Sequence, residues 1–171
     1  MHSDRPAVRI RAVTAADIPD LAGVQLRSAL AGFAHIFPES IPKPTQPELE
    51  DEWAVLVARS DRTILAATIE ERIVATVVFG SDDDTDKETD CMLLKLYVAP
   101  DHFGQGIGTT LYDEAIKSLR GRGYSRARLW VLEENTSARR MYERRGWEPR
   151  PWVRSDWPGS GVNEVGYVMD L

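Results

Sequence analysis

The sequence predicts an α/β (α+β) fold, with one mixed, mostly antiparallel central sheet of about six or seven strands flanked by about four helices. Three observations predict this class. Apolar residues alternate in a strand-like pattern near the start of the chain. Two strand-like runs follow each other directly at residues 63–80, which is typical of an antiparallel pair. A glycine-rich helix after residue 98 separates two further runs, which predicts a parallel pair with a right-handed crossover.

In the first half of the chain, strands are expected at residues 8–14, 63–71, 72–80 and 91–98, and helices at residues 15–30 and 48–60. Thr14 and Asp17 resemble a capping box that opens the first helix. The second helix follows a proline-rich loop and carries acidic residues in its first turn. The acidic residues Asp82–Asp84 lie between two strands, and we interpret them as a solvated loop.

In the second half, the glycine-rich helix is followed by strands at residues 126–132, 147–154 and 163–171, with a short helix at residues 135–146. Gly146 is the expected C-terminal cap of that short helix. The chain contains no internal repeat and no stretch with the composition of a linker. A single domain over residues 1–171 is therefore expected.

The composition is that of an ordinary globular protein. Hydrophobic residues make up 43% and charged residues 28% of the 171 residues. No apolar run approaches the ~18 residues that a membrane span needs, and the first residues lack the apolar segment of a signal peptide. Cys91 is the only cysteine, and the three histidines lie far apart. We expect a cytoplasmic protein without a structural metal.

Charge is distributed unevenly along the chain. Residues 1–105 contain 10 Lys and Arg against 18 Asp and Glu, whereas residues 106–171 contain 11 against 9. The isoelectric point of about 5.1 disfavours nucleic acid as the main partner. The basic second part can still bind a small polyanion, while the acidic first part faces a cationic partner.

Glycines occupy alternate positions at the start of the central helix: Gly104, Gly106 and Gly108. Glycine costs conformational entropy there, so this pattern indicates that an anionic group approaches the backbone closely. A phosphate-binding P-loop would need a lysine after its last glycine, and Thr109 follows instead. A dinucleotide fingerprint would lie in the first strand–helix unit and read G-x-G-x-x-G, which this segment does not.

Two motifs resemble those of the GNAT superfamily of N-acetyltransferases. The run VAPDHFGQGIGTTL is similar to its acyl-CoA-binding motif, although Phe103 stands where Arg or Gln is usual. The run NTSARRMYERRGW is similar to its second motif, one helix and one strand further on. The matching positions of the second motif are Asn135, Ala138, Tyr142, Glu143, Gly146 and Trp147. The resemblance covers at least residues 90–150 and implies a GNAT-like fold.

The resemblance also implies roles toward acetyl-CoA. The pyrophosphate would lie on the turn formed by Phe103, Gly104, Gln105, Gly106, Ile107, Gly108 and Thr109. The pantetheine arm would pair with the strand residues Leu96, Tyr97 and Val98, where an N–H would polarise the thioester carbonyl.

Four residues of the second motif take further implied roles. Asn135 and Ala138 would contact the cofactor arm, although Asn135 is equally suited to cap its helix. Arg144, or its neighbours Arg139 and Arg140, would meet the 3′-phosphate. Tyr142 would act as the general acid that protonates the departing thiolate, and its alternative role is that of a core tyrosine.

The general base and the acceptor pocket stay open. Relatives use a Glu on the strand at residues 91–98, and that position is Met92 here. Asp90 and Glu71 are candidates, directly or through water, although an ordinary surface carboxylate is the favoured explanation of each. Relatives build the acceptor pocket where this chain has five aromatic residues, which packing would also explain: Phe33, His35, Phe37, Trp152 and Trp157.

The implied function is direct transfer of the acetyl group of acetyl-CoA to a primary amine, through a ternary complex. The acceptor would be a small-molecule or peptide amine, and a homodimer is left open. Cys91 lies in an apolar strand without a sign of activation, so no covalent acyl-enzyme is expected. The alternative is a non-catalytic acyl-CoA-binding module that senses its ligand or binds a partner.

Overall fold

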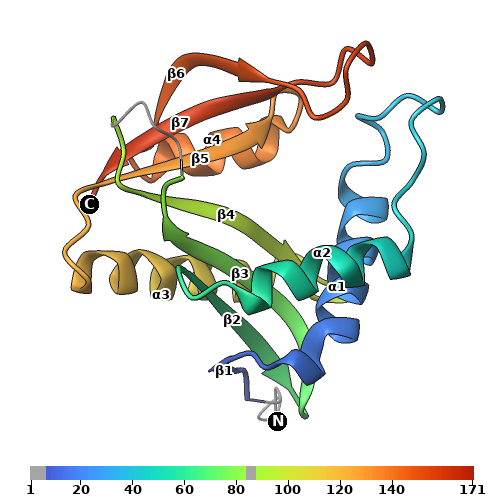
Figure 1. The fold of residues 1–171 in the computed structure, drawn as a ribbon, viewed down its shortest axis with the longest axis vertical. Coiled ribbons are helices and arrows are strands. Elements are labelled where there is room, and N and C mark those ends of the chain that lie inside the picture. The colour runs from blue at the N-terminus through green and yellow to red at the C-terminus, as the bar shows by residue number, and fades with distance from the viewer. Residues whose placement is uncertain (1–6, 84–87) are drawn as a thin grey trace, which may run out of the picture.

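The computed structural model describes residues 7–83 and 88–171, which are arranged around a seven-stranded sheet (Figure 1). The strands are β1 (Arg9–Ala12), β2 (Arg62–Ile69), β3 (Arg72–Ser81), β4 (Cys91–Val98), β5 (Arg126–Leu132), β6 (Glu148–Arg154) and β7 (Glu164–Asp170). The helices are α1 (Ile18–Gly32), α2 (Gln46–Ala58), α3 (Ile107–Gly121) and α4 (Thr136–Arg144), with short 3-10 turns η1 (Ala15–Asp17) and η2 (Pro100–His102). The order of elements is the predicted one.

The sheet has the strand order β1-β2-β3-β4-β5-β7-β6. All neighbouring strands are antiparallel except β4 and β5, which are parallel and joined through α3. This confirms the predicted mixed, mostly antiparallel sheet.

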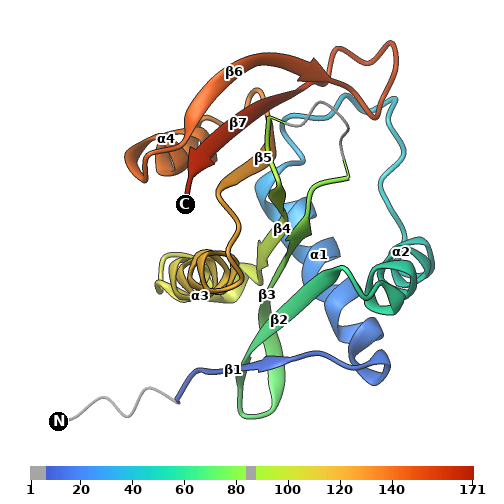
Figure 2. The ribbon, with the colours of Figure 1, turned by 60° about the vertical axis from the view of Figure 1, so that its left-hand side comes forward.

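The helices cover the two faces of the sheet, with α1 and α2 on one face and α3 and α4 on the other (Figure 2). Each face has its own apolar core, one centred on Leu111 and Leu119 of α3 and one on Trp53 of α2. The middle strand β3 is buried on both faces from residue 73 to residue 80. Its sequence is accordingly apolar almost throughout and does not alternate.

Local sequence signals start the first two helices. Thr14 and Asp17 form the predicted capping box, in which the Asp17 carboxylate accepts from the Thr14 N–H at 2.7 Å. Helix α2 begins at Gln46, two residues earlier than predicted, because Thr45 and Glu48 form a second capping box. The proline in its first turn is compatible with helix, since no intrahelical partner is lost there.

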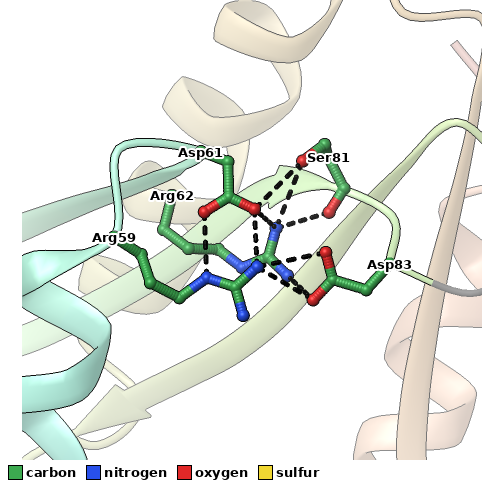
Figure 3. Close-up of polar contacts among 5 residues, drawn as sticks. All are labelled: Arg59, Asp61, Arg62, Ser81 and Asp83. Carbon is green, nitrogen blue, oxygen red and sulfur yellow. Dashed lines mark hydrogen bonds and ion pairs between the residues drawn. The ribbon is translucent and has the colours of Figure 1, made fainter.

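The interpretation of Asp82–Asp84 as a solvated loop is wrong for Asp82, whose side chain is buried, whereas Asp83 is 53% exposed although it forms ion pairs. Asp82 forms a buried ion pair with Arg128 of β5 at 3.0 Å. Asp83 pairs with Arg62 and, at 3.0 Å, with Arg59 beside the start of β2 (Figure 3). Asp84 lies outside the described residues. The acidic loop therefore fastens two separate parts of the sheet to each other.

Among residues 7–83 and 88–171, no helix has the length and apolarity needed to cross a bilayer.

Candidate active site

Strands β4 and β5 are paired at only three positions, Cys91–Leu93 against Ala127–Leu129. Beyond them the strands separate, β4 running on to Val98 and β5 to Leu132 without pairing to each other (Figure 1). We call this region, residues 94–98 of β4 and 130–132 of β5, the split. Both strands turn backbone N–H and C=O groups toward it, and such groups need hydrogen-bond partners when they are covered.

A β-bulge shapes the β4 side of the split. Val78 of β3 is opposite Lys95, but the next residue, Phe79, is opposite Leu93, so Leu94 is the additional residue. A bulge bends its strand and changes where the following side chains point. After it, Lys95 and Tyr97 lie on the α1–α2 side of the sheet, while Leu96 and Val98 pack against the α3 core.

The glycine turn joins β4 to α3 and leaves the helix N-terminus open. Gly104 and Gly106 have φ of +72° and +81°, a conformation that favours glycine, and Gly106 is the N-cap of α3. A Cβ on either glycine would meet no atom within 4 Å. A Cβ on Gly108 would lie 3.1 Å from the Val98 side chain, so this glycine lets α3 rest on β4. The first amides of α3 lack intrahelical acceptors, and the helix dipole is positive there.

The other side chains of the turn differ in their exposure and in their hydrogen bonds. Phe103 is 48% exposed. The side chain of Gln105 donates to the carbonyl of Asp101 at 3.0 Å and so braces the turn from within. Thr109, in the first turn of α3, accepts a hydrogen bond from Arg145 at 3.2 Å.

Arg145 is the basic residue that the structure brings to the start of α3, and the sequence motifs did not single it out. It also stacks over the ring of Tyr112 at 5.2 Å. A cavity of about 360 Å³ lies beside it, with Lys117 and Arg120 of α3 in its lining. Its position three residues after Tyr142, at the C-terminal cap of α4, was the sequence signal that could have identified it.

The three arginines named from the sequence are placed differently. Arg139 donates to the Tyr167 hydroxyl at 2.9 Å, and that hydroxyl donates to Glu143 at 2.7 Å. This arrangement fastens α4 to β7. Arg140 and Arg144 are exposed and form no hydrogen bond or ion pair with any other described residue.

Asn135 caps the start of helix α4, and the helix carries Tyr142 on the α3 side of the sheet. The Asn135 side-chain oxygen accepts from the Ala138 N–H at 3.2 Å, which makes Asn135 the N-cap and leaves its amide donors available. Tyr142 packs against the rings of Tyr112 and Trp147, with centroids 6.4 and 6.0 Å away.

The Tyr142 hydroxyl forms no hydrogen bond with any described residue. Burial, followed by the charges of Tyr112 and Tyr97, raises the pKa of Tyr142 above its ordinary value, against the smaller effect of Arg145. The phenol is therefore protonated throughout the physiological range. Tyr142 packs against the α3 core together with Leu96 and Val98, so it lies on the same face of the sheet as these residues of the split.

The two carboxylates considered as general bases lie elsewhere. Asp90 accepts hydrogen bonds from the backbone N–H groups of Ser125 and Arg126, at 2.8 and 2.9 Å, at the closed end of the β4–β5 pair. Glu71 lies in the β2–β3 turn, exposed and 3.7 Å from Arg9. The hydrogen bonds of Asp90 and the exposed ion pair of Glu71 explain these two carboxylates without a role as general base.

Two other carboxylates lie on the α1–α2 side of the split. Glu52 of α2 pairs with Lys95 at 3.0 Å, and Glu164 of β7 pairs with Arg154 of β6 at 2.7 Å. Burial disfavours the charged form of Lys95, but Tyr97, Glu52 and Glu164 outweigh it and raise the pKa. Sequence reasoning missed these pairs, because their partners come from different elements.

Aromatic residues connect the loops on this side. Phe37, after α1, meets Trp157, between β6 and β7, edge to face with centroids 4.8 Å apart. Trp152 of β6 lies 6.4 Å from Trp130 of β5. Phe33 is half-buried at the end of α1, and His35 is exposed.

Within the described ranges, no cluster of three or more His, Cys, Asp or Glu side chains is arranged to hold a metal ion.

One family model and several curated proteins are similar to this chain. The model of the acetyltransferase (GNAT) family matches residues 28–147. The phosphinothricin N-acetyltransferase of Streptomyces viridochromogenes is 24% identical over 98% of this chain and 89% of its own length. An uncharacterized N-acetyltransferase of Methanocaldococcus jannaschii is 40% identical, but over 35% of this chain and 26% of its own length.

Solved structures resemble the chain over nearly its whole length. The PaiA N-acetyltransferase of Thermoplasma acidophilum, in complex with coenzyme A, superimposes with a TM-score of 0.72 at 22% identity, covering 96% of this chain and 99% of the other. The ribosomal-protein-alanine N-acetyltransferase of Brucella melitensis gives 0.74 at 21% identity, covering 95% and 99%. With the family model covering residues 28–147, the chain belongs to the acetyltransferase (GNAT) family.

Proposed function

We propose that the chain, as one acyltransferase domain, transfers the acetyl group of acetyl-CoA directly to a primary amine within a ternary complex. The observation that carries the proposal is the split: two parallel strands separate beside an open helix N-terminus, and Tyr142, whose pKa burial raises, packs against the same core as the split residues Leu96 and Val98. Acetyl-CoA supplies an acetyl group that is already activated as a thioester.

The residues present fit an elongated anionic cosubstrate. The open amides of α3 and the side of Gly104 and Gly106 that no atom occupies would receive the pyrophosphate. Arg145, Lys117 and Arg120 supply positive charge beyond the first turn of α3, where a terminal phosphate would lie. The backbone groups of residues 96–98 that do not pair with β5 suit the amides of a pantetheine arm, and the Asn135 amide donors are available for a further hydrogen bond.

Within this arrangement the chain's residues have separate tasks. The backbone N–H groups of β4 in the split would hold the thioester carbonyl oxygen and stabilise the charge that develops on it. As the amine nitrogen attacks the carbonyl carbon and the C–S bond breaks, Tyr142 would donate its phenolic proton to the departing sulfur. The ammonium proton of the acceptor must leave before attack, toward a carboxylate or water on the α1–α2 side.

Direct transfer, without an acyl-enzyme intermediate, agrees with the burial of the only cysteine. Cys91 is fully buried, and burial raises the pKa of its thiol well above the ordinary value. A thiol of this kind is a poor nucleophile, so an acyl-enzyme on Cys91 is disfavoured.

A thermal-shift titration with acetyl-CoA, CoA, NAD and ATP tests the proposal first. At about 100-fold over Kd, a ligand adds about 2.7 kcal/mol to the free energy of unfolding, or roughly 5–10 °C for a domain of this size. Acetyl-CoA and CoA should shift the transition and the other two should not. A panel of amines then tests release of free thiol. CoA binding without turnover of any amine would favour the non-catalytic acyl-CoA-binding module.

A further inference from the structure

Two ion pairs beside the split share an unusual arrangement of buried and exposed partners. In the first, Lys95 is the buried member, at 16% exposure, and Glu52 is 47% exposed. In the second, Glu164 is the buried member, at 15% exposure, and Arg154 is 44% exposed. The inner charges are thus a cation on β4 and an anion on β7, each with its counter-charge toward solvent.

Both inner charges lie on the same face of the sheet. Lys95 contacts Glu52 of α2 and lies 6.0 Å from the Trp53 ring, which places it on the α1–α2 face. In β7, Val165 and Tyr167 pack into the α3 core, so the alternation of side chains turns Glu164 to the α1–α2 face as well. Glu164 is opposite Leu132, the last β5 residue of the split, and Lys95 belongs to the β4 side, so the two inner charges lie on one face at the two sides of the split. The charge of Glu164 also contributes to the raised pKa of Lys95.

This environment does not suit a simple cationic amine. An ammonium ion entering it meets the buried ammonium of Lys95, which the exposed Glu52 neutralises only in part because water screens that pair. An acceptor that carries a positive and a negative group side by side meets opposite charges at both inner residues. The exposed Glu52 can turn toward solvent when such a molecule binds. Arg154 stacks over the Trp130 ring at 4.6 Å and donates to only one carboxylate oxygen of Glu164, which leaves the other oxygen for the ammonium.

Building on the proposed acetyl transfer, we propose that the acceptor is a small zwitterion, an amine with a carboxylate or similar anionic group beside its amino group. Lys95 binds the anionic group, and Glu164 binds and orients the ammonium. Because Lys95 is positive and Glu164 is negative, the two inner charges favour an acceptor that carries both signs. Their own net charge is zero.

The experiment compares α-amino acids with their amides, which keep the side chain and the amino group but lack the negative charge. Alanine, methionine, phenylalanine and tryptophan, each with its amide, are assayed with acetyl-CoA for thiol release. The amino group of an amide is less basic, so chemistry without recognition favours the amide. We expect at least one amino acid to exceed its amide about tenfold to a hundredfold in kcat/KM, as for a hydrogen bond between charged groups.

A charge-swap variant tests the residue assignment without breaking the ion pair. Lys95→Glu combined with Glu52→Lys keeps two opposite charges in contact and reverses the inner one. We expect this double variant to prefer the amide over the amino acid. Arg9→Gln, which removes an exposed ion-pair member far from the split, is the matched control and should keep the preference.

The possible outcomes separate this proposal from the transfer itself. Equal use of amino acids and amides, better use of a tetrapeptide amine, or an unchanged preference in the charge swap would overturn the zwitterion proposal while acetyl transfer stands. If no amine is acetylated, thermal shifts of the CoA-bound protein still test the zwitterion proposal separately from acetyl transfer. Stabilisation by amino acids but not by amides would support the zwitterion site, and none by either would reject it.

Discussion

Tyr142→Phe removes a single oxygen atom and leaves the packing of the ring in place. The ring would keep its neighbours Tyr112 and Trp147, at 6.4 and 6.0 Å between centroids. No described residue bonds to the lost hydroxyl, so the free energy of unfolding should change by less than about 0.5 kcal/mol. If the phenol is the general acid, kcat should fall about 10²–10⁴-fold, which is roughly 3–5 kcal/mol of activation free energy.

Tyr112→Phe provides the matched control, because the Tyr112 hydroxyl stabilises the fold by a hydrogen bond and has no proposed part in catalysis. That hydroxyl accepts a hydrogen bond from the Trp147 indole N–H at 2.8 Å, and both side chains are buried. Leaving this N–H without a partner should cost about 1–3 kcal/mol and lower Tm by several degrees, with kcat within about twofold of the wild type.

The assay is thiol release at saturating acetyl-CoA with the best amine, beside thermal denaturation of both variants. We expect Tyr142→Phe to be stable and slow, and Tyr112→Phe to be less stable and active. Full kcat in Tyr142→Phe would refute the acid role. So would a loss of activity that simply follows the loss of stability in both.

Three further predictions concern other parts of the molecule. Gly106→Val places a branched residue at φ +81°, which costs at least 1–2 kcal/mol and should weaken CoA binding about tenfold or more by calorimetry. Asp17 has its pKa lowered from 3.8 to about 2, chiefly by its hydrogen bond with Arg11, so it stabilises the fold above pH 3.8 by about 2 kcal/mol and loses this as pH falls through 2. Asp17→Asn should therefore lower Tm at pH 7 and have little effect near pH 2. Trp157→Ala removes the contact with Phe37 and should raise the acceptor KM with little change in CoA affinity.

The predictable parts of the fold and site depend on contacts between residues close in sequence. The capping box of Thr14 and Asp17 spans three residues, as does the cap of Asn135 on Ala138. The glycine turn likewise needs positive φ at Gly104 and Gly106 within one loop. Such signals are local, so a motif or a period reveals them before any tertiary contact is known. The order of elements and the mixed sheet followed from the same kind of information.

The parts that sequence reasoning missed depend on the register of strands and on helix placement. Lys95 and Glu52 are 43 positions apart, and Arg128 reaches Thr89 across 39. Neither pairing follows from spacing. The bulge at Leu94 decides which side chains of β4 face α2, and nothing in its apolar surroundings marks the extra residue. The Asp82 side chain was therefore expected to be solvated, although Arg128 of β5 holds it in a buried ion pair.

Only three paired positions hold β5 to β4, so further contacts must fix the point where the two strands diverge. Asp90 provides such contacts at the closed end of the pair. Its carboxylate accepts from the backbone N–H groups of Ser125 and Arg126, and its own N–H donates to the Arg126 carbonyl at 3.0 Å. With the buried Asp82–Arg128 pair beside it, Asp90 fixes the point from which the strands diverge.

Asp90→Ala tests this role against the alternative of a general base. Loss of two hydrogen bonds to a charged acceptor should lower stability by about 2–3 kcal/mol, since this carboxylate is exposed and partly screened. Because the angle of the split is then less constrained, acetyl-CoA affinity should fall as well, while the pH profile of kcat keeps its shape. Asp90→Asn, which retains one acceptor oxygen, should lie between. If instead kcat alone falls and its pH profile changes, with stability and acetyl-CoA affinity intact, Asp90 is the base and the divergence of β4 and β5 is maintained by the buried ion pair.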